Sequence, residues 1–304
     1  MTLEFRQAVR KAVPMLIGLA GPSGSGKTYS SLLLAAGIAG PEGRVGMLDT
    51  ENGRGEMYAD SPAIMKALSS GYEYTRLDPP FTPAAYVAGI EAAEKAGLQV
   101  LVVDSLSHEW EGTGGCEEIA EEYAIKGQPN WKMAKIAHKR FANHCLSASM
   151  YIIFCMRARE KVKFVKVGNK TEVVPIGIQP ICEKNWMFEM LVSMRIEEET
   201  HHAIPVKVPE PLIHLFPKEV LITEGLGQRI REWNETGTAL PVGEQLGKRA
   251  RAAAEQGYKC YREFYDGLAK AQKKELRDAD HEQLKRIAQE FDINQAAKEE
   301  QEQS

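Results

Sequence analysis

The chain has 304 residues, of which 26% are charged and 43% hydrophobic, and its net charge is −4 at pH 7. This length allows one large domain and a smaller one. The nearly balanced charge excludes a globally basic nucleic-acid-binding protein, so any such site must be a local patch. Five cysteines without a C-x-x-C pair argue against a zinc site or a disulfide framework. No apolar run approaches the roughly 20 residues of a membrane span, and the first residues do not resemble a signal peptide, so we expect a cytoplasmic protein without a membrane partner.

Apolar runs alternate with helical patterns through the first 200 residues. We expect strands at 15–20, 44–49, 100–104, 150–156 and 190–196, and helices at 28–39, 83–96, 117–125 and 131–147. Further strands are expected at 203–208, 212–216 and 220–222, followed by a short helix at 227–233. The alternation predicts an α/β fold with a mostly parallel central sheet flanked by helices.

The composition changes near residue 236. We expect a core at 1–235, a linker at 236–243, a helical module at 244–292 and a disordered polar tail at 293–304. Two or three amphipathic helices are predicted in the module. Their apolar faces are expected at Leu246, Ala253, Tyr258, Tyr261, Phe264, Tyr265, Leu268, Leu284, Ile287 and Phe291.

The octapeptide GPSGSGKT, Gly21–Thr28, fits the phosphate-binding pattern G-x-x-x-x-G-K-[ST]. It stands between an apolar run and a helical stretch, which is the context this loop requires. Its glycines let backbone N–H groups surround a polyphosphate, Lys27 reaches the outer phosphates, and the Thr28 hydroxyl can ligate Mg²⁺. The alternative is a flexible Gly/Ser turn. The predicted nucleotide-binding residues are Gly21, Pro22, Ser23, Gly24, Ser25, Gly26, Lys27, Thr28 and Tyr29.

Two acidic strand ends accompany this loop. The run 100–104 closes on Asp104, which we expect to hold Mg²⁺ through water from the strand beside the loop. Asp104 is followed by Ser105 rather than by a glutamate, the usual place of the water-activating carboxylate in the AAA+ group. We therefore place that role at Glu51, beyond the strand 44–49, which we expect next to the P-loop strand. Alternatively, Asp49 and Glu51 are solvated loop charges or a helix start.

A strand ending Asp-x-Glu after a P-loop, followed by a strand ending Asp-Ser, resembles the RecA-like recombinase ATPases. The strings LDTENGRGEMY, VVDSLSHEWEG, NWKMAKIAHKRF and IIFCMRAREK resemble the compact phage-encoded branch, the phage ATP-binding proteins that include the Sak-type single-strand-annealing ATPases. The resemblance covers about residues 12–235. It implies ATP and Mg²⁺ as cofactors, a catalytic Glu51, a magnesium-linked Asp104, and a bacterial host cell as the location.

The resemblance also implies a sensor at the end of the strand 151–155. RecA has an Asn-Gln pair there, whereas this chain has Cys155-Met156, which leaves Arg157 as the nearest polar candidate. It further implies a basic residue that reaches a neighbouring subunit of a ring or filament. Lys207 matches that position, with Arg195 and Lys184 as rivals.

RecA-like recombinases hold single-stranded DNA on two loops. The first corresponds to 105–115, where the glycines predict a mobile loop and Trp110, near His108, can stack on a base or pack on the following helix. The second, 157–172, carries six positive and two negative side chains and reads as a hairpin turning at Gly168-Asn169. Its proposed DNA-binding residues are Arg157, Arg159, Lys161, Lys163, Phe164, Lys166 and Lys170. The alternative is a solvated edge hairpin whose lysines discourage aggregation.

Together these features predict an oligomeric, DNA-stimulated ATPase of phage recombination or annealing. A P-loop small-molecule kinase, with Arg157 and Arg159 in a phosphate-clamping lid, and a nucleotide switch acting through partners are the alternatives. The chain from Glu244 to its last residue has twelve basic and thirteen acidic residues, so the helical module is not expected to be a DNA arm. We expect it to dock a recombination or single-strand-binding protein, or else to act as a solubilising cap.

Overall fold

The computed structural model describes residues 7–167, 170–239, 242–276 and 278–303, which form two compact units. The larger unit comprises Pro14–Ala142 and Met150–Thr236. The smaller unit takes the described residues before Pro14, Asn143–Ser149 and the residues from Gly237 onward. The core expected at 1–235 therefore begins later than the sequence suggested, because the N-terminal stretch pairs elsewhere: β1 (Lys11–Ala12) lies parallel to β10 (Thr238–Ala239).

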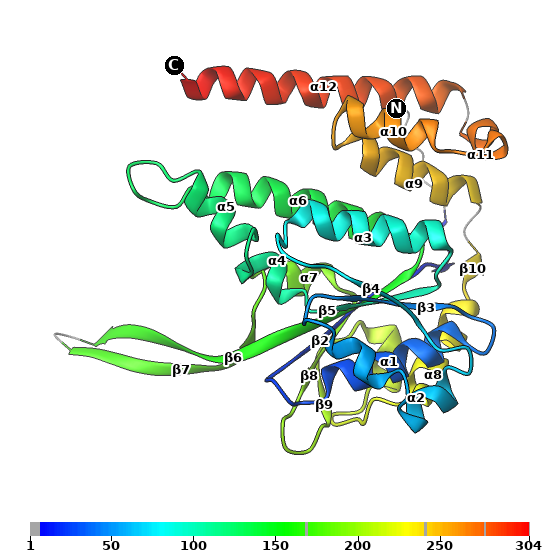
Figure 1. Ribbon diagram of the computed structural model, residues 1–304, viewed down its shortest axis with the longest axis vertical. Helices are drawn as coiled ribbons and strands as arrows, with labels where there is room; N and C mark the ends of the chain where they lie inside the picture. The colour runs from blue at the N-terminus through cyan, green and yellow to red at the C-terminus, as the bar shows by residue number, and fades with distance from the viewer. Residues whose placement is uncertain (1–6, 168–169, 240–241, 277, 304) are drawn as a thin grey trace. The chain divides into compact units, whose positions relative to one another are not determined.

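The larger unit is built on a sheet with the strand order β4-β3-β5-β6-β2-β8-β9, and β7 pairs with β6 (Figure 1). Neighbours from β4 to β8 are parallel, whereas β8/β9 and β6/β7 are antiparallel. The strands are β2 (Leu16–Gly21), β3 (Val45–Asp49), β4 (Glu73–Arg76), β5 (Val100–Asp104), β6 (Tyr151–Val167), β7 (Lys170–Pro180), β8 (Val192–Ile196) and β9 (Ala203–Lys207). The predicted mostly parallel α/β sheet is confirmed.

Helices cover both faces of this sheet (Figure 1). They are α1 (Lys27–Ala39), α2 (Pro62–Ala67), α3 (Pro83–Ala96), α4 (Ser107–Glu111), α5 (Cys116–Glu122), α6 (Trp131–Ser147), α7 (Trp186–Glu189) and α8 (Glu224–Glu235), with 3₁₀ helices η1 (Arg54–Tyr58) and η2 (Glu210–Leu215). On one face α1 and α8 pack so closely that a Cβ on Gly37 would lie 1.9 Å from the carbonyl oxygen of Glu224. Glycine at this helix crossing lets the two backbones touch.

The apolar runs form central strands because both faces of the sheet are buried. Ile153 and Cys155 of β6 join the cluster under α1 and α8, whereas Phe154 between them packs against Phe141 and Trp186 on the other face. A strand covered on both sides reads as a continuous apolar run rather than an alternating one. This is why the central strands were predictable from sequence.

Two predicted strands are wrong. Residues 212–216 fall mostly within the 3₁₀ helix η2, and 220–222 contribute one isolated bridge, between Val220 and Ala203. Pro209, Pro211 and Pro217 explain the first error, because proline cannot donate to a strand ladder and favours the first turn of a helix.

The smaller unit includes the last residues of α6, and its described part from Gly237 onward contains four helices: α9 (Val242–Ala254), α10 (Tyr258–Asp266), α11 (Lys270–Glu275) and α12 (Asp278–Gln303). Its core buries Leu246, Tyr261 and Leu284, three of the residues predicted to form apolar faces. The tail predicted to be disordered instead extends α12 to Gln303, since it is rich in helix-favouring Ala, Glu, Gln and Lys. Of the expected linker, residues 240–241 lie outside the described part. No helix in the described ranges is both long and apolar enough to cross a membrane.

Candidate functional site

The phosphate-binding loop joins β2 to α1. Gly24 and Gly26 both have φ +86°, a left-handed conformation that glycine adopts without strain. Because α1 begins at Lys27, the N–H groups of its first turn lack helical partners. The Ser25 Oγ is buried and has no hydrogen-bond partner among the described atoms. Orphan donors around a glycine cradle fit a polyphosphate.

Lys27 lies across this loop. Its Nζ donates hydrogen bonds to the carbonyl oxygens of Gly21, at 3.0 Å, and Pro22, at 2.7 Å. A bound polyphosphate would offer the ammonium group a charged partner in place of these carbonyls. Tyr29 follows on α1, with its ring 6.2 Å from that of Tyr58.

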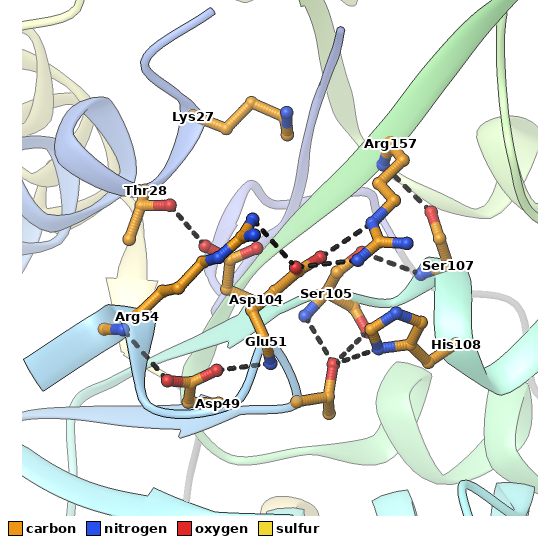
Figure 2. A network of polar contacts seen from close by, with 12 residues as sticks. Lys27, Thr28, Asp49, Glu51, Arg54, Asp104, Ser105, Ser107, His108 and Arg157 are labelled. Carbon is orange, nitrogen blue, oxygen red and sulfur yellow. Dashed lines mark hydrogen bonds and ion pairs between the residues drawn. The ribbon is translucent and has the colours of Figure 1, made fainter. Parts of the chain in front are cut away.

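Thr28 and Asp104 form the candidate magnesium site. The Thr28 Oγ1 donates to a carboxylate oxygen of Asp104 at 2.5 Å, although 76 residues separate them in sequence (Figure 2). Burial raises the pKa of Asp104 to about 6, against the effect of the Thr28 hydrogen bond. A hydroxyl and a carboxylate oxygen are ligands that Mg²⁺ prefers, so this donor set fits the ion. A bound cation would lower this pKa and so favour the charged carboxylate.

The strand order corrects two expectations about position. Asp104 ends β5 and Asp49 ends β3, but the strands hydrogen-bonded to the P-loop strand β2 are β6 and β8. Neither acidic strand therefore lies beside β2. The Asp104 side chain still reaches Thr28 because carboxyl ends of parallel strands share one edge of the sheet.

Asp49 is a buried anchor rather than a solvated charge. Its carboxylate accepts hydrogen bonds from the N–H of Glu51 at 2.5 Å, the N–H of Gly55 at 2.9 Å and the hydroxyl of Tyr74 at 2.9 Å. These three bonds fix the turn after β3. Asp49 thus positions Glu51.

Glu51 is held by Arg157 (Figure 2). The Nε of Arg157 donates to Oε1 of Glu51 at 2.8 Å and a terminal nitrogen donates to Oε2 at 2.7 Å, a bidentate ion pair. Burial raises the pKa of Glu51, but Arg157 outweighs it, and the net pKa lies below the ordinary value. Arg157 thus stands at the predicted sensor position, after the buried Cys155 and Met156. Sequence reasoning did not foresee this ion pair.

A pocket of about 700 Å³ joins these parts. Its walls include Lys27, Thr28, Glu51, Asp104 and Arg157. Each of these residues was predicted as a site residue, but from different motifs of the sequence. Three further lining residues were missed: Arg54, Met57 and Tyr58 of η1. These residues could have been found in the sequence from their position directly after the Asp-x-Glu segment.

The first predicted DNA loop is not a mobile loop. Ser107–Glu111 forms α4, with Ser107 and Glu109 buried. Trp110 stacks on Trp131 of α6 at 5.6 Å, which agrees with the packing alternative. His108 accepts or donates a hydrogen bond with Thr50 through Nδ1 at 2.8 Å.

A buried polar group stands behind this helix. The carboxylate of Glu109 lies 3.0 Å from Nδ1 of His138 and accepts a bond from the Cys116 thiol at 3.4 Å. Burial lowers the pKa of His138, but Glu109 raises it more, so the net pKa is above the ordinary value. Burial also raises the pKa of Cys116. Glu109 thus favours the charged form of His138 in the core of the larger unit.

The predicted hairpin is confirmed. β6 and β7 pair from Ala158–Pro180 to Val167–Lys170, with a bulge after Lys161. Lys161, Lys163 and Lys166 are exposed, whereas Arg159 lies 3.5 Å from Glu111. The turn residues Gly168-Asn169 lie outside the described part, as do the side chains of Phe164 and Lys170. Arg157, also among the predicted DNA-binding residues, pairs with Glu51 where the ribbon begins, and its contact with DNA stays a prediction.

Lys207 is bound within its own chain. Its Nζ donates to the carbonyl oxygens of Phe188 at 2.5 Å and Met190 at 2.7 Å. A role in a neighbouring subunit's site would require these bonds to break. Of its rivals, Arg195 lies 4.0 Å from Glu197 and Lys184 is exposed.

Comparison with known proteins agrees with this geometry. Residues 14–217 match the family described as an AAA domain, and the chain belongs to that family. A search of curated proteins finds no match. Among solved structures, a KaiC-like protein from the hyperthermophilic archaeon Pyrococcus horikoshii OT3 is similar, at 13% identity and a TM-score of 0.38, over 67% of this chain and 89% of that one. The chain is a P-loop ATPase of the AAA type, built on an α/β fold with a mostly parallel central sheet.

Proposed function

We propose that this ATPase acts on single-stranded DNA in phage recombination or annealing, as an oligomer. The observation that carries the proposal is the course of β6. This strand leaves the central sheet beside the P-loop strand, places Arg157 on Glu51, and continues as a basic ribbon paired with β7. Lysines on an exposed ribbon suit a phosphate backbone.

The residues of the site have different roles in ATP hydrolysis. Lys27 and the loop N–H groups would hold the phosphates, and Thr28 and Asp104 would hold Mg²⁺, which supplies charge neutralisation on the phosphates. Glu51 is the carboxylate placed to orient the attacking water and accept its proton. Its two bonds to Arg157 lower its pKa and hence its basicity, so loss of either bond would make Glu51 a stronger base.

The proposed role in phage recombination is supported by the four sequence segments that resemble phage ATP-binding proteins. The proposed binding of single-stranded DNA is supported by the basic β6/β7 hairpin. The test is binding of a labelled single strand by the full chain with a non-hydrolysable ATP analogue, with sedimentation of the same mixture. We expect salt-sensitive binding and a species larger than a monomer. Absence of single-strand binding at low salt would contradict the proposal and favour the kinase or switch alternatives.

A further inference from the structure

A second cavity, of about 430 Å³, lies beside the nucleotide pocket in the larger unit. The two share Glu51, Arg54 and Arg157 as walls. The second cavity then extends away from the P-loop to Arg76 at the end of β4 and to His108 of α4. Its remaining walls have no part in the hydrolysis described above.

Three guanidinium groups line this cavity. Arg54, Arg76 and Arg157 have side chains 67%, 46% and 40% exposed. Their carboxylate partners are Glu51, at 3.5 Å from Arg54 and 2.7 Å from Arg157, and Asp78, at 2.6 Å from Arg76. A guanidinium has five N–H donors, so these pairings leave donors unused. Planar forks with spare donors match the oxygens of a phosphate group.

Glu51 and Asp78 are the two carboxylates of the lining, and the rest of the wall is uncharged. His108 stacks on Phe81 at 4.8 Å, and burial together with the charge of Arg157 lowers the pKa of His108. Leu77 and Pro79 add apolar surface. A cationic cluster beside an aromatic pair suits one nucleotide, with its phosphate on the arginines and its sugar or base on the neutral wall.

We propose that this cavity, the anion pocket, binds a phosphodiester group of a single strand, and that the bound phosphate competes with Glu51 for Arg157. The inference rests on the proposed function. A single strand is favoured over a free anion because β6 runs from Arg157 to Lys161, about 13 Å further along the ribbon at about 3.3 Å per residue. A DNA single strand bound along the lysines of the ribbon would therefore extend to the anion pocket.

The competition links DNA to hydrolysis. Glu51 borders both cavities, and Arg157 holds both of its oxygens. A phosphate that takes donors from Arg157 releases a carboxylate already facing the nucleotide pocket. Occupation of the anion pocket therefore raises the rate of ATP hydrolysis.

The experiment titrates the dinucleotide TpT, and separately inorganic phosphate, into the full chain saturated with ADP and Mg²⁺, so that the P-loop is filled. The variant is Arg76→Ala, because Arg76 lines the anion pocket and not the nucleotide pocket. The matched control is Arg262→Ala, an exposed arginine of the smaller unit 3.6 Å from Asp266. We expect Arg76→Ala to weaken TpT binding by about tenfold, the loss of one charge-assisted contact, and Arg262→Ala to leave it unchanged.

Equal TpT affinity in wild type and Arg76→Ala, or no TpT binding at all, overturns the proposal. Inorganic phosphate that binds more tightly than TpT and depends on Arg76 overturns the single-strand assignment. A second arm measures stimulation of hydrolysis by oligo-dT. Stimulation that is undiminished in Arg76→Ala overturns the role of the anion pocket but keeps the proposed function. Arg76-dependent TpT binding without any stimulation by oligo-dT overturns the competition with Glu51, and absence of single-strand binding by the full chain overturns the proposed function itself.

Discussion

Arg157 and Glu51, 106 residues apart in sequence, form a bidentate ion pair at 2.8 and 2.7 Å beside the P-loop. The pair joins the carboxylate placed for water activation to the strand that becomes the basic ribbon. In this pair both carboxylate oxygens of Glu51 accept hydrogen bonds from Arg157, and Arg157 lowers the pKa of Glu51. Glu51 is therefore ionised and engaged at neutral pH.

Glu51→Gln is expected to retain ATP binding and to lose hydrolysis by a factor of about 10²–10⁴, the usual contribution of a positioned base. The amide keeps the shape of the side chain but cannot accept a proton. Phosphate release and nucleotide binding are measured on the same preparation. Glu73→Gln, at an exposed glutamate paired with Arg44, is the matched control and should hydrolyse normally. A normal rate in Glu51→Gln assigns water activation to another residue.

Lys27→Ala is expected to abolish nucleotide turnover without unfolding the protein. The ammonium group of Lys27 bonds to two loop carbonyls, those of Gly21 and Pro22, rather than to core residues. Turnover and the thermal unfolding midpoint are compared with those of Lys66→Ala, which lies on α2 outside the pocket. Turnover that persists in Lys27→Ala would argue against phosphate binding at this loop.

Replacement of Lys161, Lys163 and Lys166 with alanine should flatten the salt dependence of single-strand binding. Each neutralised phosphate contributes a slope of about −0.7, so three lost contacts change it by roughly two units. The effect should be similar for unrelated sequences, since phosphate contacts carry no base information. The control is the alanine triple at Lys259, Lys270 and Lys274, exposed lysines of the smaller unit. An unchanged slope in the hairpin variant would make the ribbon a solvated edge.

The Glu109–His138 pair predicts a pH dependence of stability. Because the pKa of His138 is raised on folding, its contribution is fully present below the unfolded value of about 6.5 and is lost as the pH rises through the folded pKa. Glu183 and Glu189 also favour the charged form. Denaturant titrations should show Glu109→Gln to be more destabilised, relative to wild type, at pH 6 than at pH 9. A pH-independent difference would mean that His138 is neutral in the folded protein.

The central strands and the P-loop could be predicted because their signals are local. A strand buried on both faces is a continuous apolar run, and the phosphate-binding loop needs its residues within eight positions. The segment 212–216 was mistaken for a strand because its apolar residues outweighed the flanking prolines. The neighbours of β2 could not be predicted, since strand order depends on crossover connections rather than on the strands themselves.

The ion pair between Glu51 and Arg157 was beyond local reasoning. Arg157 lies at the start of a cationic segment, so its sequence position predicted a role in the basic hairpin that follows rather than a pairing with Glu51. Only the parallel pairing of β3 with β5 and of β5 with β6 brings Arg157 close to the turn that follows β3. Lys207 was equally ambiguous, because a basic residue near the last strands can bond to its own chain or reach another subunit.

The most direct measurement of the central claim is the steady-state rate of ATP hydrolysis with and without single-stranded DNA, in wild type and in Glu51→Gln. We expect the wild-type rate to rise when single-stranded DNA is added, and Glu51→Gln to show no hydrolysis above background under either condition. A wild-type rate that is the same with and without single-stranded DNA would contradict the claim.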